Sequence, residues 1–454
     1  MSQEAPIPNR WIGLDGHKHY LVAGGVNAQL DHILGPQRVQ LSRLDSWARK
    51  TLTPFDALAL EMSTNSFEIY DELVPLVHSM ILVHPPHVNL ITRAQVKTDQ
   101  KSAFTLARLH ATGLLPSIWV PPQDVRDHRA LVSQRAKMVR LSTQAKNRLH
   151  AVLHRHHLPL PEQGSLFDSL NHDWWFNLDV SPIEHIRIQS DLDTLSFAQS
   201  QVARLEDAIL LVAIHDERAL FLIQLPGVGL ITAVTLLAAI GHERRFPTPK
   251  QLVGYAGLGA RVHDSGQTHR TGRITKTGRR DIRAAMVEAA HTACRVHPHW
   301  KAELARLEPR LGHNKAIVAV ARKLLVAVWH VLNERCVDRF ADPEMVARKL
   351  AHYAYDLGRD NRPDGQSVGE FVRRQLDRLN IGADLDAIQW GKRTIPMPPA
   401  RLAVCRCLRG LSSSSTSQRS MIGLTGSNTG LDRDCVTVYC GTEPSSSALR
   451  MVSR

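Results

Sequence analysis

The chain has 454 residues, with 56 Lys and Arg against 43 Asp and Glu, which gives a formal net charge of +13. Hydrophobic residues make up 43%, enough for sizeable cores, so the composition excludes wholesale disorder and the length predicts two to four domains of about 100–200 residues each. The positive balance favours a polyanionic partner.

Composition also bears on the compartment. The first ten residues hold no apolar run, so we expect no secretory signal. Charged residues interrupt the long apolar stretches, so we expect no membrane span. Six cysteines are too few for a disulfide scaffold in a chain of this length. These features together favour the cytoplasm.

Short apolar runs alternate with helical patterns in the first quarter of the chain. Residues 11–26 predict two strands around a glycine-containing turn, and residues 57–61 and 80–83 predict two further buried strands. Helical periodicity covers residues 44–50, 66–77 and 101–114. Strands that come first and then alternate with helices indicate an α/β domain over residues 8–118.

A basic helical pattern begins after a pair of prolines at 121–122. Residues 126–157 contain eight Lys and Arg and a single acid, Asp127. Helical periodicity returns over 190–222 after an irregular segment, so we expect an antiparallel hairpin or coiled-coil arm over residues 122–222. The basic face is suited to a nucleic-acid backbone, although a merely solvated helix face is the alternative. The candidate contacts on the arm are Lys137, Arg140, Lys146 and Arg148.

A third, mostly helical unit is expected over residues 225–335. It opens with Leu225-Pro-Gly-Val-Gly229 and an apolar helix over 230–240, which fits a helix–hairpin–helix pattern. Gly227 and Gly229 allow the backbone to approach a phosphate, and the helix that follows offers unpaired N–H groups. An ordinary packing corner between two helices is the alternative interpretation.

A basic stretch rich in glycine and threonine follows, over residues 261–283. It holds seven Lys and Arg and only two acids, so we expect a flexible loop that lies along a nucleic-acid backbone. Its candidate contacts are Arg270, Arg273, Lys276, Arg279 and Arg280. Ser265 lies beside a glycine among these cations, where a hydroxyl can attack a phosphodiester, but on these residues alone a plain turn serine is the better explanation.

The last part of the chain is less informative. Residues 336–400 are mixed and weakly patterned. Residues 401–454 are rich in serine and cysteine and show no apolar period, so we expect a disordered tail there.

Three carboxylates lie where strands end or a helix begins. Asp15 ends the first predicted strand, Glu61 ends a later one, and Asp99 comes just before a helix. Acids at the ends of neighbouring strands converge, and carboxylate oxygens are the ligands that Mg²⁺ prefers. Two such ions about 4 Å apart activate a nucleophile and stabilise a leaving oxygen. Solvated strand-end acids or helix caps are the alternative.

In this order the three units resemble the DEDD-type insertion-sequence transposases, the insertion-sequence-one-ten family, over roughly residues 10–335. No single motif would be sufficient, but many occur in the same order. The quoted motifs are Gly13-Leu-Asp15-Gly-His-Lys18, Leu58-Ala-Leu-Glu61-Met-Ser63, Lys97-Thr-Asp99, Arg148-Leu-His-Ala-Val-Leu153, Pro226-Gly-Val-Gly229, Lys250-Gln-Leu-Val-Gly-Tyr-Ala-Gly-Leu258, Ser265-Gly266, Gly272-Arg-Ile-Thr-Lys276 and Ala319-Val-Ala-Arg-Lys-Leu324.

The resemblance implies an RNase H-like N-terminal domain, similar to the Holliday-junction resolvase RuvC, whose acids Asp15, Glu61 and Asp99 would bind Mg²⁺. It implies a C-terminal transposase domain in which Ser265 would become covalently joined to DNA, with Ser142 and Thr268 as competing hydroxyls. Family members act as oligomers, so a dimer or tetramer is expected, and some use a structured bridge RNA. Double-stranded DNA would be the main partner, in a prokaryotic cytoplasm at the nucleoid.

One position departs from the family pattern. The fourth acid should follow Asp99 by three residues, and Ser102 stands there, a neutral and weaker ligand. Three hypotheses therefore remain open. The chain is a transposase that cuts and rejoins DNA through Ser265, or a metal-dependent junction endonuclease without the serine step, or a catalytically inactive DNA- or RNA-binding relative.

Overall fold

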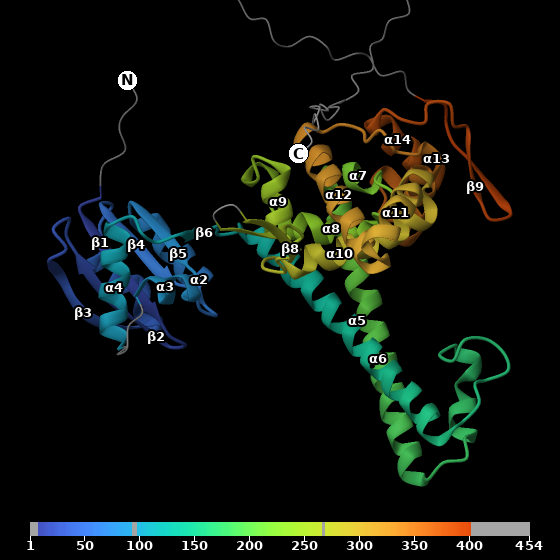
Figure 1. The fold of residues 1–454 in the computed structure, drawn as a ribbon, viewed down its shortest axis with the longest axis horizontal. Helices are drawn as coiled ribbons and strands as arrows, with labels where there is room; N and C mark the ends of the chain where they lie inside the picture. Colours follow the sequence, from blue (N-terminus) through green and yellow to red (C-terminus); the bar gives the residue numbers. More distant parts are fainter. Residues whose placement is uncertain (1–7, 93–97, 266–267, 401–454) are drawn as a thin grey trace, which may run out of the picture. The chain divides into compact units, whose positions relative to one another are not determined.

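The computed structural model describes residues 8–92, 98–265 and 268–400, and the chain divides after Pro122 into two compact units (Figure 1). The side chains of 89–92, Ser169, 262–264 and 268–271 lie outside the description, as does the predicted tail over 401–454.

The N-terminal unit is built on a mixed six-stranded sheet in the order β3-β2-β1-β4-β5-β6. Its strands are β1 Arg10–Gly16, β2 Tyr20–Val26, β3 His32–Gln40, β4 Asp56–Glu61, β5 Ser79–Val83 and β6 Ser117–Ile118. β2 pairs antiparallel with both β1 and β3, whereas β1, β4 and β5 run parallel. This is an RNase H-like arrangement.

Helices cover both faces of this sheet, which explains why its central strands are apolar on both sides. They are α1 Leu44–Thr51, α2 Ser66–Leu73, α3 Pro85–Thr92 and α4 Asp99–Ala111. α1 and α2 bury one face together with Leu14, Leu58 and Leu60. Leu106 of α4 packs on the other face against Ala59. The sequence pattern did not predict β3, because this edge strand is largely exposed and therefore lacks apolar alternation.

The second unit begins with an arm made of two long helices that run side by side, α5 Gln123–His156 and α6 Pro182–His215 (Figure 1). Ion pairs cross between the two helices, joining Arg135 to Glu206 and Arg148 to Asp191. The far end of the arm has a small core of its own around Trp175, whose indole N–H donates to the carbonyl of Leu166 at 3.2 Å.

The helical pattern expected over 190–222 contains two helices. α6 starts earlier, at Pro182, where the Ser181 hydroxyl accepts from the Glu184 amide. The chain then breaks at Asp216, whose carboxylate caps α7, Glu217–Ile223. Both helices bury an apolar face, so the helical period continues across Asp216 and does not reveal the break.

The remaining helices enclose one large core that extends from Val132 to Met397. They are α8 Leu230–Ile240, α9 Pro249–Tyr255, α10 Arg280–Val296, α11 Pro298–Leu311, α12 His313–Glu334, α13 Pro343–Leu357 and α14 Val368–Leu379. Two short hairpins accompany them, β7 Ala260–Ser265 with β8 Thr268–Ile274, and β9 Ala387–Trp390 with β10 Arg393–Pro396. The weakly patterned stretch 336–400 therefore supplies α13 and α14, whose Leu350 and Phe371 are fully buried.

By length and composition, α12 is a helix that can cross a membrane. Half of its most apolar window is buried, and Ile317, Val320, Leu324 and Val328 lie in the core of the second unit. Its contacts with α7, α9, α10 and α11 are those of a central core helix.

Candidate functional site

Two of the predicted acids lie at one edge of the N-terminal sheet. β1 and β4 are parallel neighbours with Leu14 opposite Leu60, so Asp15 and Glu61 come next in register on adjacent strands. Because the carboxyl ends of parallel strands share an edge, both side chains reach the same place. The pleat sends them to the face opposite the buried Leu14 and Leu60.

The third acid arrives on α4, which crosses β1 at very close range. A Cβ built on Gly13 would overlap the carbonyl oxygen of Ala103 and lie 2.7 Å from the Ala107 amide nitrogen. Glycine is therefore needed at this crossing. Asp99 is the first residue of α4, capped by the Thr98 hydroxyl, and Ser102 follows one turn later on the same side.

These four positions line one cavity. Its volume is about 330 Å³, and its lining residues are Asp15, Gly16, Glu61, Met62, Ser63, Thr98, Asp99 and Ser102. Ser102 thus stands in the wall where the family pattern puts an acid, and its hydroxyl is neutral. Three carboxylates and one hydroxyl face a shared space that is open to substrate.

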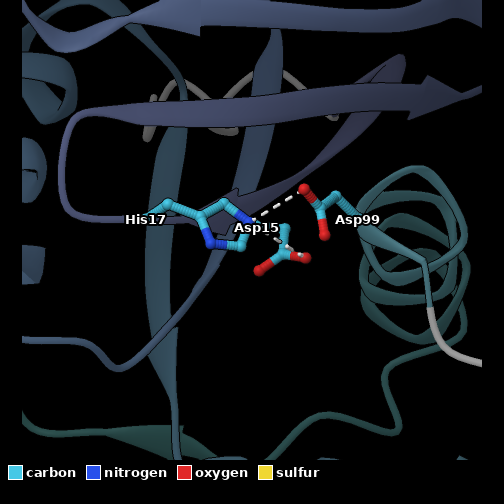
Figure 2. A group of neighbouring side chains, drawn as sticks. All are labelled: Asp15, His17 and Asp99. Carbon is cyan, nitrogen blue, oxygen red and sulfur yellow. Dashed lines mark ion pairs between the residues drawn. The ribbon is translucent and has the colours of Figure 1, made fainter.

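His17 joins this group, although the sequence analysis did not single it out as a site residue. Its Nε2 lies 3.2 Å from Asp99 Oδ2 and 3.9 Å from Asp15 Oδ2 (Figure 2). That nitrogen is buried, yet it forms no hydrogen bond of acceptable geometry with the described residues. One ligand atom from each of Asp15, His17 and Asp99 lies within 4.8 Å of the other two.

Neighbouring side chains hold His17 and Asp99 in place. Asn65 donates its amide to the His17 carbonyl at 3.2 Å, and the Tyr20 ring stacks on the imidazole with centroids 4.6 Å apart. The Tyr20 hydroxyl donates to Asp99 Oδ2 at 3.1 Å. Desolvation and the nearby Asp99 carboxylate raise the pKa of Tyr20, so this donor keeps its proton. Arg38 lies over the outer face of the ring, at 3.8 Å.

The donor set fits a divalent metal ion. Carboxylate oxygens suit hard cations such as Mg²⁺ and Mn²⁺, and an added imidazole favours a first-row transition metal over Mg²⁺. The His17 nitrogen, buried without a hydrogen bond between two carboxylates, is the observation that supports such an ion. In the sequence, the one signal for His17 is its place in Asp15-Gly-His-Lys18, two residues after the acid at the end of the first strand.

Ser265 lies in the second unit, at the end of β7. The expected flexible loop contains a two-stranded hairpin in which Ser265 pairs with Thr268 of β8. The Ser265 side chain is exposed next to the hairpin tip, whose residues 266–267 lie outside the description. Ser142, a competing hydroxyl, is half-buried on α5.

The cations predicted around this hairpin fall into two groups. Arg273, Lys276 and Arg280 are exposed. Arg279 forms a bidentate ion pair with Asp281, which occupies its guanidinium. Arg270 lies on β8, but its side chain is outside the description.

The arm cations divide in a similar way. Lys137 and Arg140 are exposed on α5. Lys146 lies 5.1 Å from the centroid of Phe167, and Arg148 is paired with Asp191 at 2.7 Å. The last two therefore stabilise the arm itself, whatever else they contact.

The two glycines of the α7–α8 turn have different surroundings. Gly227 has φ +78°, and a Cβ there would overlap the Ala289 carbonyl oxygen of α10. Gly229 is exposed, caps the start of α8 and has nothing within 4 Å of an added Cβ. Close helix packing thus accounts for Gly227, whereas Gly229 is the exposed N-cap residue of α8.

Comparison with known proteins gives two family matches. Residues 13–158 match a family model described as Transposase, that of the IS110 type with DEDD acids, and residues 219–305 match the Transposase IS116/IS110/IS902 family. The first match contains all three acids and the second contains Ser265.

Individual relatives agree. A putative transposase of Sinorhizobium fredii is 28% identical over 66% of this chain and 75% of its own length. A probable family 20 transposase of Pseudomonas aeruginosa is 25% identical over 72% of this chain and 97% of its own. A pilin gene-inverting protein of Moraxella bovis is 26% identical over 57% and 73%. The chain belongs to the DEDD-type IS110 family of transposases, DNA-binding enzymes of recombination.

Proposed function

We propose that this protein cuts and rejoins the DNA of its own insertion sequence with the help of a divalent metal ion, Mg²⁺ in the cell. The observation that carries the proposal is that Asp15, Glu61 and Asp99, which are far apart in the sequence, line one cavity. These carboxylates and His17 would hold the metal. When bound, it neutralises phosphate charge and lowers the pKa of a coordinated oxygen.

The residues around the cavity have separate tasks in this proposal. Asp15, Glu61 and Asp99 would repel a phosphodiester on their own, so their task would be to hold the metal ion where its positive charge can bind and orient the phosphate. Tyr20 fixes Asp99 by its hydrogen bond, so that the Asp99 carboxylate points into the cavity. Ser102 contributes a hydroxyl in place of a charge, which predicts a weaker metal site that still functions.

Ser265 is the nucleophile of the cutting step. Its Oγ forms a bond to phosphorus while the bond from phosphorus to a sugar oxygen breaks, and the serine proton ends on that sugar oxygen. Rejoining is the reverse: a sugar hydroxyl attacks the phosphorus, the bond to the Ser265 Oγ breaks, and the proton returns to Oγ. The exposed position of Ser265 at the end of β7, and the exposed Arg273 and Lys276 at the other end of the hairpin, suit a negatively charged backbone. We place the acid site and the serine on different protomers of a dimer or tetramer.

The exposed cations of α5, and those from β8 to the start of α10, would contact DNA and a structured RNA that specifies donor and target. Lys137, Arg140, Arg273, Lys276 and Arg280 are the contacts we favour, because they are exposed. Such contacts make binding strongly salt-dependent. The protein would act in the cytoplasm, at the nucleoid.

Two other functions are possible for this cavity, and the assay described next distinguishes them from the first. A metal-dependent junction endonuclease would use the cavity without Ser265. A catalytically inactive DNA- or RNA-binding relative is favoured by Ser102, which leaves the cavity one charge short.

A covalent-trapping assay separates the three. The full-length protein is incubated with Mg²⁺, with DNA carrying the joined ends of the element and with the flanking non-coding RNA, and then run on a denaturing gel. We expect a protein–DNA adduct that is lost in Ser265→Ala and Asp15→Asn. Thr268→Ala, the residue paired with Ser265, and Asp45→Asn, an exposed acid paired with Arg49, are the matched controls. Cutting without an adduct supports the endonuclease, and binding alone supports the inactive relative.

A further inference from the structure

The turn between α7 and α8 surrounds a lysine ammonium with its own carbonyl oxygens. Lys349 of α13 reaches into the turn, and its Nζ donates to the carbonyl oxygens of Ile223, Leu225 and Val228 at 2.8, 2.7 and 2.9 Å. An ammonium has three donors, and all three are used here.

The Leu225 carbonyl also accepts from the Val228 amide at 3.1 Å, so Lys349 is its second donor. Ile223 is the last residue of α7, so its carbonyl has no helical partner. The positive φ of Gly227 turns the chain back on itself, which brings the Val228 carbonyl toward that of Leu225. Backbone carbonyls that converge in this way replace the hydration shell of a monovalent cation.

The charge of Lys349 is compensated by these carbonyls. Among the described residues no carboxylate forms an ion pair with Lys349, whereas its neighbour Arg348 pairs with Glu344 at 3.0 Å. Burial lowers the pKa of Lys349 to about 8, so the group is still an ammonium at neutral pH. Hydrogen bonds from a charged donor are the strong ones, which offsets the cost of removing this charge from water.

The turn is fixed on its inner side and open on its outer side. The buried Gln224 donates to the Cys336 carbonyl at 3.2 Å and accepts from the Asp338 amide at 2.8 Å. Gly227 packs on α10. On the outside, Gly229 is exposed at the start of α8, where no described side chain caps the first amides.

We propose that the α7–α8 turn is a monovalent-cation site whose cation is supplied by the protein itself, as the Lys349 ammonium. Lys349 is a positioning residue that holds the first amides of α8 where they can meet a nucleic-acid phosphate. That second part rests on the proposed function. It also means that the turn depends on α13, which lies outside the matched segment 219–305.

The first experiment tests the cation site without any nucleic acid. Thermal unfolding of full-length K349A is measured in ammonium, potassium and tetramethylammonium chloride at equal ionic strength. Removing the side chain leaves the three carbonyls exposed to a cavity that ammonium or K⁺ can fill and tetramethylammonium cannot. We expect K349A to melt several degrees below wild type in tetramethylammonium, at roughly 2–4 °C per kcal/mol, and to recover much of the loss in ammonium.

Matched variants separate this effect from general destabilisation. K349M fills the space with an uncharged chain and should be destabilised in all three salts alike. R348A removes an exposed cation from the same helix and should show no dependence on the cation. If K349A melts at the same temperature in all three salts, the cation site is wrong. If K349A does not fold, its refolding yield in ammonium against tetramethylammonium makes the same comparison, and equal yields overturn the proposal.

The second experiment measures the affinity of a labelled DNA duplex by fluorescence anisotropy in the same salts, each relative to wild type. We expect K349A to bind about tenfold more weakly in tetramethylammonium, with an unchanged salt slope because Lys349 itself contacts no phosphate. Ammonium should restore the affinity, and R348A should bind as wild type does. Equal binding by K349A and wild type in tetramethylammonium overturns the positioning role. Failure of wild type to bind any duplex contradicts the proposed function instead, and leaves the thermal result to decide the cation site.

Discussion

Gly13 of β1 and Ala103 of α4 approach so closely that no side chain fits between them. This contact fixes how α4 crosses the sheet, and α4 carries Asp99 and Ser102 into the cavity that Asp15 and Glu61 line. A residue without a side chain therefore determines where the third acid lies.

Replacing Gly13 with alanine should separate α4 from β1. The overlap with the Ala103 carbonyl cannot be relieved by a rotamer change, so we expect a loss of about 2 kcal/mol or more and a loss of strand cleavage. Thermal unfolding and the trapping assay measure the two effects. Gly35→Ala is the control, because an added Cβ on that glycine meets nothing within 4 Å. An active, equally stable Gly13→Ala protein would contradict this account of the site.

Restoring the fourth acid should strengthen metal binding. Ser102→Asp adds a carboxylate to a wall of the cavity, and metal affinity rises with the number of charged ligands. We expect affinity for Mg²⁺ or Mn²⁺ to increase roughly tenfold or more, measured by titration calorimetry. Ser102→Asn has nearly the same shape without the charge, so an equal gain in that variant would show that charge is not the cause.

His17 should make the site more favourable to Mn²⁺ than carboxylates alone. Its Nε2 lies near both Asp15 and Asp99, and imidazole is a better ligand for Mn²⁺ than for Mg²⁺. We expect His17→Ala to weaken Mn²⁺ binding by about ten- to a hundredfold and Mg²⁺ binding by less. His19→Ala, two residues along the same turn, is the control. Equal losses for the two metals would mean that His17 acts only by packing on Tyr20.

Alanine should cost the protein much more stability at Gly227 than at Gly229 of the α7–α8 turn. Gly227→Ala places a side chain at φ +78° and against the Ala289 carbonyl, so we expect a loss of about 3 kcal/mol or more. Gly229→Ala should cost about 1 kcal/mol or less, because its surroundings are open. If the exposed amides of α8 bind phosphate, DNA affinity per folded molecule falls for Gly229→Asp and not for Gly229→Ala. Urea unfolding and anisotropy give the two readouts.

Acid should destabilise the N-terminal unit through His110 of α4. Burial lowers the pKa of His110 to about 4, below the 6.5 of the unfolded chain, and its Nε2 has no hydrogen-bond partner among the described residues. The unfolded state therefore takes up a proton first. The stability present above pH 6.5 is lost as the pH falls toward 4, by on the order of 2–3 kcal/mol.

The test is hydrogen exchange of the α4 amides in the full-length protein between pH 4 and 7, corrected for intrinsic rates. His110→Leu should flatten the pH dependence, since the variant has no group to protonate there. An unchanged slope in that variant would assign the acid sensitivity to other groups.

The pattern of apolar and polar residues was enough to predict the order of the parts. Period-two and period-3.6 patterns record which residues are buried along each element, so the strands that end on Asp15 and Glu61 and the long helices of the arm were predictable. Local chemistry also marked the glycine turn after α7. The family resemblance, carried by motifs quoted from the chain, was confirmed by two independent matches.

Which of these residues meet depends on how the elements pack. The Gly13 crossing brings Asp99 to Asp15 and His17, and no periodicity encodes a contact between elements so far apart in the chain. Lys349 shows the same limit. The sequence around Lys349 is that of an ordinary helical lysine. The packing of α13 on the α7–α8 turn is what brings its ammonium to three carbonyl oxygens.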